Sequence, residues 1–76
     1  MAKTFSGRQV ANILVRDFGF REVRQKGSHL KLKKQSGRKS IITVVPMHRE
    51  LAGGTLRGVL KLAEVEYKDF LKATRK

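Results

Sequence analysis

The chain has 76 residues and no cysteine, and its 18 lysines and arginines against 6 aspartates and glutamates give it a net charge of +12. This length predicts one domain over residues 1–76 with a thin core, while the lack of cysteine excludes a disulfide framework and a thiolate zinc site. Because roughly 2–8 net charges suffice to keep a small domain soluble, we expect a polyanionic partner: nucleic acid first, otherwise an acidic protein or an anionic membrane surface.

A helix is predicted at the N-terminal end of the chain. The sequence Ser6-Gly7-Arg8-Gln9 has the form of a capping box, in which Ser6 and Gln9 satisfy each other's free backbone amides. Apolar residues then recur at helical spacing, namely Val10, Ile13 and Leu14. Gly19 follows Phe18 and is the natural end of this helix.

Two strands are predicted next, joined by a turn at residues 26–28. The first covers residues 20–25, with Val23 expected to point inward. The second covers residues 29–34 and alternates cleanly, so that Leu30 and Leu32 share one face while His29, Lys31 and Lys33 share the other. The apolar face should meet the core, and the basic face should meet solvent.

The third predicted strand follows a loop of turn-forming residues at 35–39. Residues 40–45 are β-branched and nearly all apolar, which favours the best-buried strand of the sheet, and Pro46 ends it. A second helix starts near Gly53-Gly54 with Thr55 as its expected N-cap. Its buried stripe is Leu56, Val59, Leu60 and Ala63, and a last short helix over residues 66–72 brings Tyr67, Phe70 and Leu71 to the core.

These elements predict an α+β fold of order α-β-β-β-α with a short C-terminal helix. Three antiparallel strands form one sheet, and the helices cover one of its faces. The other face stays open to solvent, and the strand alternation puts His29 there.

His29 is the candidate catalytic residue. Histidine has an ordinary pKa near 6.5, so a neutral imidazole can take the proton of a ribose 2′-hydroxyl at physiological pH. Lys26, Lys31 and Lys33 would hold the phosphate and offset the charge that develops on it. From the residues alone, a simple phosphate contact by His29 competes with catalysis, and a buried core histidine is the third alternative.

The other candidate features are weaker. His48 is either an acid for the leaving oxygen or a contact to phosphate or backbone. The histidines and scattered carboxylates have no metal-ligand spacing, so we expect no metal site. Gly53-Gly54-Thr55 is more simply a helix cap than a phosphate loop, because the lysine of a P-loop is missing.

Several motifs resemble the HicA toxin family. They are Ser6-Gly7-Arg8, the run from Gly19 through Val23-Arg24-Gln25-Lys26-Gly27-Ser28-His29, Val45-Pro46-Met47-His48, Gly54-Thr55-Leu56-Arg57 and Phe70-Leu71. The resemblance spans about residues 6–71, and its most specific part is residues 23–29. Two positions depart from the family's pattern: Leu30, where many relatives have another histidine or polar residue, and Glu64, where relatives often have glycine.

The resemblance implies a fold like that of double-stranded-RNA-binding domains. It implies cleavage of mRNA without a metal or other cofactor, and inhibition by a HicB-like antitoxin. The family's catalytic histidine falls on His29, and its Pro-x-His element falls on His48. We therefore expect a toxin with endoribonuclease activity whose RNA contacts come from Arg24, Lys26, Ser28, Lys31, Lys33 and His48.

Two other functions stay open at this point. One is a non-catalytic RNA-binding module that uses the same basic face, and the other is a basic ribosome- or DNA-associated structural protein, which only the charge supports. No apolar run is long enough to cross a membrane, and residues 1–4 lack the apolar segment of a signal peptide. We therefore expect a cytoplasmic protein without a membrane partner.

Overall fold

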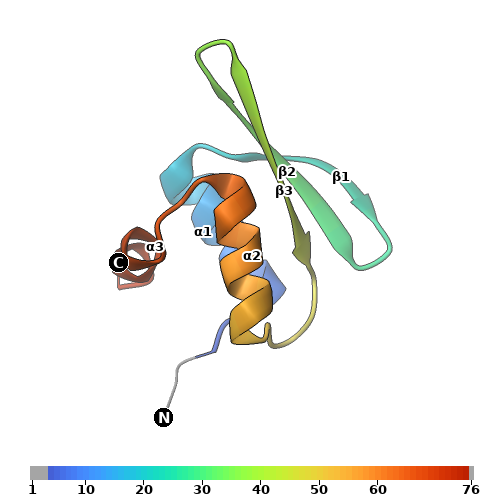
Figure 1. Ribbon diagram of the computed structural model, residues 1–76. Helices are drawn as coiled ribbons and strands as arrows, with labels where there is room; N and C mark the ends of the chain where they lie inside the picture. Colours follow the sequence, from blue (N-terminus) through green and yellow to red (C-terminus); the bar gives the residue numbers. More distant parts are fainter. Residues whose placement is uncertain (1–3, 76) are drawn as a thin grey trace.

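The computed structural model describes residues 4–75, which form three helices and a three-stranded antiparallel sheet. The elements are α1 (Gly7–Phe18), β1 (Arg21–Lys26), β2 (His29–Ser36), β3 (Lys39–Pro46), α2 (Gly53–Ala63) and α3 (Tyr67–Ala73). β2 is the central strand, and the helices lie on one side of the sheet (Figure 1). The α+β fold expected from the sequence is confirmed. No helix in the described range 4–75 is long and apolar enough to cross a membrane.

α1 begins and ends where the sequence predicts. The Ser6 hydroxyl accepts the Gln9 amide at 3.0 Å, and the Gln9 side chain accepts the Ser6 amide at 2.8 Å, which completes the capping box. Gly19 closes the helix at φ 78°, a backbone conformation that glycine adopts without steric cost. Val10, Ala11 and Leu14 are fully buried against the sheet.

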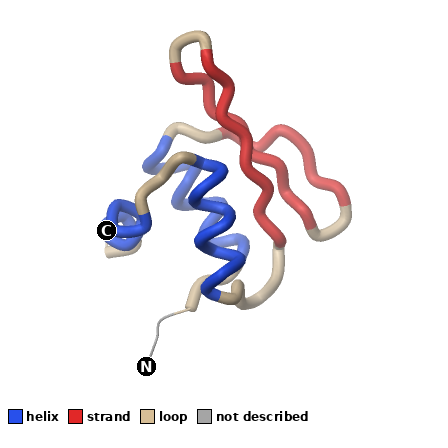
Figure 2. The backbone as a smooth tube through the Cα atoms, viewed as in Figure 1, coloured by secondary structure: helices blue, strands red, loops and turns tan. Residues whose placement is uncertain are grey.

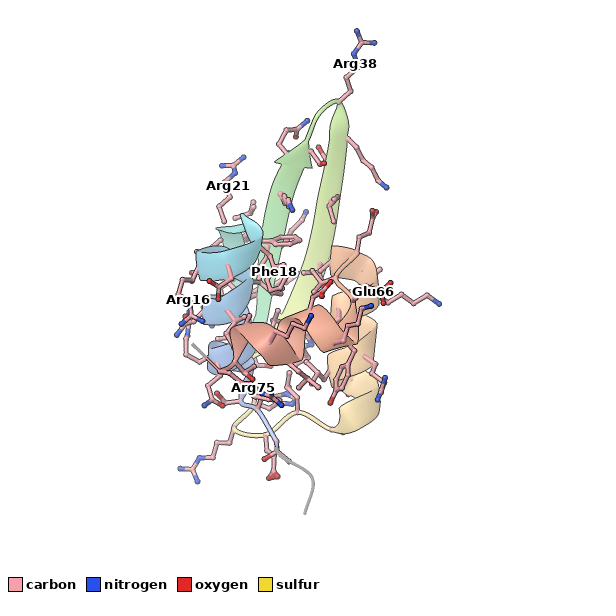
Figure 3. All side chains as sticks on the ribbon, turned by 90° about the vertical axis from the view of Figure 1, so that its left-hand side faces the viewer. Arg16, Phe18, Arg21, Arg38, Glu66 and Arg75 are labelled. Carbon is pink, nitrogen blue, oxygen red and sulfur yellow. The ribbon has the colours of Figure 1, made fainter. Side chains whose placement is uncertain are left out.

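β2 shows the predicted alternation. Leu30 and Leu32 point to the helices and are buried, whereas His29 and Lys31 are exposed on the opposite face. β2 and β3 form a long hairpin whose tip extends beyond the helices (Figure 2). Figure 3 shows Arg38 at this tip.

Two expectations about the flanking strands are wrong. Val23 does not point inward but is 46% exposed, because the helix side of β1 is taken by Glu22 and Gln25, which pair with the buried residues of β2. Residues 40–45 are not buried throughout either. Ile42 and Val44 lie on the open face, since the helices cover one side of the sheet only.

α2 has the predicted buried stripe but a different N-terminus. Leu56, Val59 and Leu60 are buried, and the buried Thr43 hydroxyl of β3 donates to the Val59 carbonyl at 2.8 Å. The N-cap is Ala52 rather than the expected Thr55, and no side chain caps the helix. The helix starts earlier than predicted because residue 52 is already extended and its carbonyl accepts the Leu56 amide at 2.9 Å.

The C-terminal part closes the core. Glu64 caps α2 with φ 58°, a left-handed conformation that glycine adopts more readily than glutamate. α3 then brings Phe70 into edge-to-face contact with Phe5, with ring centroids 5.3 Å apart. Phe70 is fully buried, while Tyr67 and Leu71 pack against the core from partly exposed positions.

Candidate nucleic-acid interface and catalytic site

The open face of the sheet carries rows of basic side chains. The register places Lys26 beside His29, Arg24 beside Lys31, and Arg21 beside Lys33. Paired residues of an antiparallel sheet point to the same side, so all of these lie opposite the buried Leu30 and Leu32. We call the surface formed by Arg21, Arg24, Lys26, His29, Lys31 and Lys33 the basic face.

A shallow depression of about 210 Å³ lies on the basic face. It is lined by Arg24, Lys26, His29, Lys31 and Val44, so residues of all three strands converge on it. The imidazole of His29 is exposed. Cations therefore surround His29 at a spot that a nucleic-acid strand can reach without any opening of the fold.

Glu22 and Asp17, the carboxylates of β1 and α1, are not part of the basic face. Glu22 pairs with buried Leu32 and so lies on the helix side of β1, where it accepts a hydrogen bond from Arg8 at 3.0 Å. Arg16 of α1 pairs with Asp17, and this hydrogen bond raises the pKa of the Arg16 guanidinium. Figure 3 shows Arg16 beside α1. Among residues 4–75, no side chain of the basic face forms an ion pair with a carboxylate, so its positive potential is not neutralised by direct partners.

A tight turn presents His29. Lys26 and His29 pair directly across Gly27-Ser28, and Gly27 has φ 57° while Ser28 does not have a positive φ, as in a type II′ hairpin. The Gln25 side-chain amide donates to the Gly27 carbonyl at 3.1 Å. The Met47 amide donates to the Ser28 carbonyl at 2.5 Å, which ties the turn to the segment after β3.

That segment is held in turn by the start of α1. The Gly7 amide donates to the His48 carbonyl at 2.9 Å. A Cβ atom on Gly7 would come within 2.0 Å of the Pro46 carbonyl oxygen, so only glycine allows this approach. The Ser6-Gly7-Arg8 and Pro46-Met47-His48 motifs, far apart in the sequence, are thus one contact that supports the turn before His29.

The predicted site residues are brought together to different degrees. Arg24, Lys26, His29 and Lys31 line one depression, and Lys33 lies on the same face in the next row. Ser28 is exposed in the turn and His48 is exposed in the loop after β3. Within residues 4–75, neither imidazole makes a side-chain hydrogen bond.

Sequence reasoning missed two members of this surface. Arg21 belongs to the basic face because it pairs with Lys33, and Val44 lines the depression because it pairs with Lys31. Alternation along residues 40–45 was the available signal for Val44. For Arg21 the signal is hidden by a bulge between Glu22 and Arg24, which shifts the alternation of β1.

A larger groove of about 420 Å³ lies at the junction of α2 and α3. It contains both signs of charge, including Lys61, Glu64 and Glu66, and the Arg57 guanidinium lies over the Tyr67 ring at 4.2 Å. This mixture does not favour a polyanion, and no histidine lines the groove. The smaller depression therefore has the better chemistry for RNA.

Comparison with known proteins identifies one family that the chain matches. The family model described as HicA toxin of bacterial toxin-antitoxin systems matches residues 7–65, which run from the start of α1 through β1, β2, β3 and α2. The search of curated proteins found no match. Among the described residues, no group of three or more histidines, aspartates or glutamates is arranged to hold a metal ion.

Proposed function

The chain belongs to the HicA toxin family and is a toxin of a bacterial toxin–antitoxin pair, and from this premise we propose that it is an endoribonuclease that cleaves mRNA with His29 as its general base. The observation that carries the proposal is the depression in which His29 is surrounded by Arg24, Lys26 and Lys31. An imidazole beside cations on an open surface suits the cleavage of a flexible polyanion.

The proposed reaction is an internal transesterification. The neutral imidazole of His29 takes the proton of a ribose 2′-hydroxyl, and the 2′-oxygen attacks the adjacent phosphorus. The bond from phosphorus to the 5′-oxygen breaks, which leaves a 2′,3′-cyclic phosphate. The 5′-oxygen departs with a proton, for which His48 is the candidate acid, since its loop is tied to the turn before His29.

The cations have two tasks in this scheme. They attract the phosphodiester backbone, and they offset the negative charge that builds on the non-bridging oxygens in the transition state. The proposed RNA contacts are Arg24, Lys26, Ser28, Lys31, Lys33 and His48. The base and the cations together need no metal or other cofactor. We also propose that the cognate antitoxin is of the HicB type and that the toxin acts in the cytoplasm, where mRNA is.

The decisive experiment is RNA cleavage by the His29→Ala variant in the presence of EDTA. Loss of a general base lowers the rate by about 10²–10⁴-fold, while the exposed side chain contributes little to folding. The wild-type products should carry a 2′,3′-cyclic phosphate and a 5′-hydroxyl, and RNA with a 2′-methoxy group at the cut site should resist. If His29→Ala cleaves RNA at the wild-type rate, the general base is another residue. His48→Ala is the matched variant for that case.

A second function deserves the same experiment because one observation favours it. General bases are usually oriented by a hydrogen bond, and within residues 4–75 the imidazole of His29 has none. A toxin that blocks mRNA by binding alone would need only the charges of the basic face. In that case His29→Ala would keep full toxicity and full RNA affinity.

A further inference from the structure

The two edges of the sheet are protected very differently. β1 forms one edge, and all its side chains are exposed and mostly charged. Its register is interrupted by a bulge between Glu22 and Arg24. Charges and bulges are the features that stop an edge strand from pairing with another chain.

β3 forms the other edge and has no bulge, and its one charged residue and its proline, Lys39 and Pro46, stand at its two ends. Its register with β2 is continuous from Ser36–Lys39 to His29–Pro46, without a bulge. Residues 40–45 contain no charged side chain and are largely β-branched. A long, regular and apolar edge of this kind is a template for a further strand.

The backbone groups on the outer side of β3 can be assigned. Ser36 and Lys39 close a two-residue turn, so hydrogen-bonded and non-hydrogen-bonded pairs alternate from there. Ser40, Ile42 and Val44 therefore direct their N–H and C=O groups away from β2. The hydrogen bond from the Met47 amide to the Ser28 carbonyl agrees with this alternation, because Met47 lies two residues after Val45 and also directs its amide toward β2.

Nothing within residues 4–75 covers this edge with backbone hydrogen bonds. The backbone bonds outside helices and strands involve no N–H or C=O of residues 40–45. α2 packs on the face of β3 instead, through Thr43 and the Val59 carbonyl. The two edge strands, β1 and β3, lie on opposite sides of β2 (Figure 2).

We propose that the cognate antitoxin binds by adding an extended strand to the outer edge of β3. The inference rests on membership of the toxin family, which implies an antitoxin, and does not depend on the chemistry of His29. The matching strand has apolar residues at its centre, opposite Ile42, and acidic residues at its ends. Arg38 lies at one end of the edge, and Arg49 lies just beyond the other.

Charge decides between this partner and a second copy of the chain. Two copies would each bring +12 to the contact, and their repulsion opposes pairing of β3 with itself. An acidic strand is attracted instead. It would also cover Ile42 and Val44, which are 41% and 38% exposed. Because Val44 lines the depression with His29, such a strand lies beside the RNA site and explains inhibition by exclusion.

The test is a proline at the edge. Ile42→Pro removes a backbone N–H that points away from β2, so the hydrogen bonds between β2 and β3 are kept. The antitoxin strand loses this hydrogen-bond donor and clashes with the proline ring. The matched control is Gln25→Pro at the β1 edge, where the amide also points outward because Gln25 directly precedes Lys26 of the closing pair. It is compared with Gln25→Ala, because both variants lose the side-chain hydrogen bond to the Gly27 carbonyl. The partner is the cognate antitoxin, identified as the protein whose co-expression restores growth.

We expect Ile42→Pro to weaken antitoxin binding at least about tenfold relative to wild type, whereas Gln25→Pro stays within about twofold of Gln25→Ala. Growth arrest by Ile42→Pro should persist when the antitoxin is co-expressed. Equal affinities of the two variants would overturn the proposal. If wild-type protein fails to cleave RNA, the proposed nuclease function falls, but these binding measurements still decide the docking edge.

A second measurement needs no variant. In the wild-type complex, hydrogen exchange at the amides of Ser40, Ile42 and Val44 should slow at least about tenfold relative to the free toxin. The outward amide of Gln25 should exchange as before. Unchanged exchange at all three β3 amides would overturn the proposal even if Ile42→Pro does not fold. Protection of these amides in the free toxin, with a dimeric mass in solution, would assign the edge to a second copy instead.

Discussion

Two turns of the same local design join the strands of the sheet, at Gly27-Ser28 and at Gly37-Arg38. Both have a glycine with positive φ in the first position, 57° and 61°. In both, a glutamine two residues before the glycine donates its side-chain amide to the glycine carbonyl at 3.1 Å. The first turn is followed by His29 and the second by Lys39, each paired across its turn.

The turns differ in what surrounds them. The first is tied to the body through the Met47 amide, and His29 after it lines a depression with Arg24, Lys26 and Lys31. The second lies at the free end of the β2–β3 hairpin (Figure 1), and Lys39 after it pairs with Glu64 at 2.6 Å. Equal local geometry thus gives one candidate catalytic position and one surface ion pair, so neighbours across the fold make the difference.

The largest expected effect comes from moving the histidine to the second turn. The double variant His29→Ala/Lys39→His places an imidazole after an equivalent turn but away from the depression. We expect RNA cleavage to stay about 10²–10⁴-fold below wild type, as in His29→Ala alone. The measurement is cleavage of a defined mRNA fragment under single-turnover conditions. Rescue by Lys39→His would mean that the turn alone makes the site.

The next effect concerns the contact that supports the first turn. Gly7→Ala forces a Cβ atom against the Pro46 carbonyl, so we expect the free energy of unfolding to fall by about 1–3 kcal/mol. Gly58→Ala is the matched control. Its Cβ would meet nothing within 4 Å in the middle of α2, so stability should rise by about 0.5–1 kcal/mol.

Denaturant unfolding of both glycine variants checks this prediction. Gly7→Ala should also lower RNA cleavage, because the loop that holds the Ser28 carbonyl shifts with Pro46. Wild-type stability of Gly7→Ala would show that the start of α1 does not support the site.

A smaller effect separates the two turns directly. Alanine at a positive φ costs about 1–2 kcal/mol, and Gly27 and Gly37 have nearly the same φ. We therefore expect Gly27→Ala and Gly37→Ala to lower the melting temperature by similar amounts, about 4–8 °C for each kcal/mol. Only Gly27→Ala should reduce cleavage as well. A matching loss of cleavage in Gly37→Ala would place the second turn in the RNA site too.

The smallest effect is on the salt dependence of RNA binding, measured with the inactive His29→Ala variant as background. Removing one phosphate contact lowers the slope of log affinity against log salt by about 0.7 for a single strand. Lys26→Ala should show this change, because Lys26 lines the depression. Arg38→Ala removes the same charge at the free hairpin end and should leave the slope unchanged. Identical slopes for both variants would indicate binding by overall charge alone.

Features that depend on neighbours in the sequence could be predicted from the sequence. The capping box of Ser6 and Gln9 and the alternation of Leu30 and Leu32 are confirmed. The predictions that Thr55 caps α2 and that Val23 points inward are wrong. α2 begins before Thr55, with Ala52 as its N-cap. In β1, Glu22 and Gln25 are the residues that pair with the buried positions of β2. The role of His29 stays a prediction.

The sequence by itself determined the order of elements, the basic surface of β2 and the family to which the chain belongs, because capping, strand alternation and motif spacing are local properties. Only the tertiary structure decided that Gly7 must be glycine, that Val44 borders His29, and that β3 leaves a regular edge unpaired. Each of these depends on segments that are distant in the chain and meet only when the sheet and helices pack together.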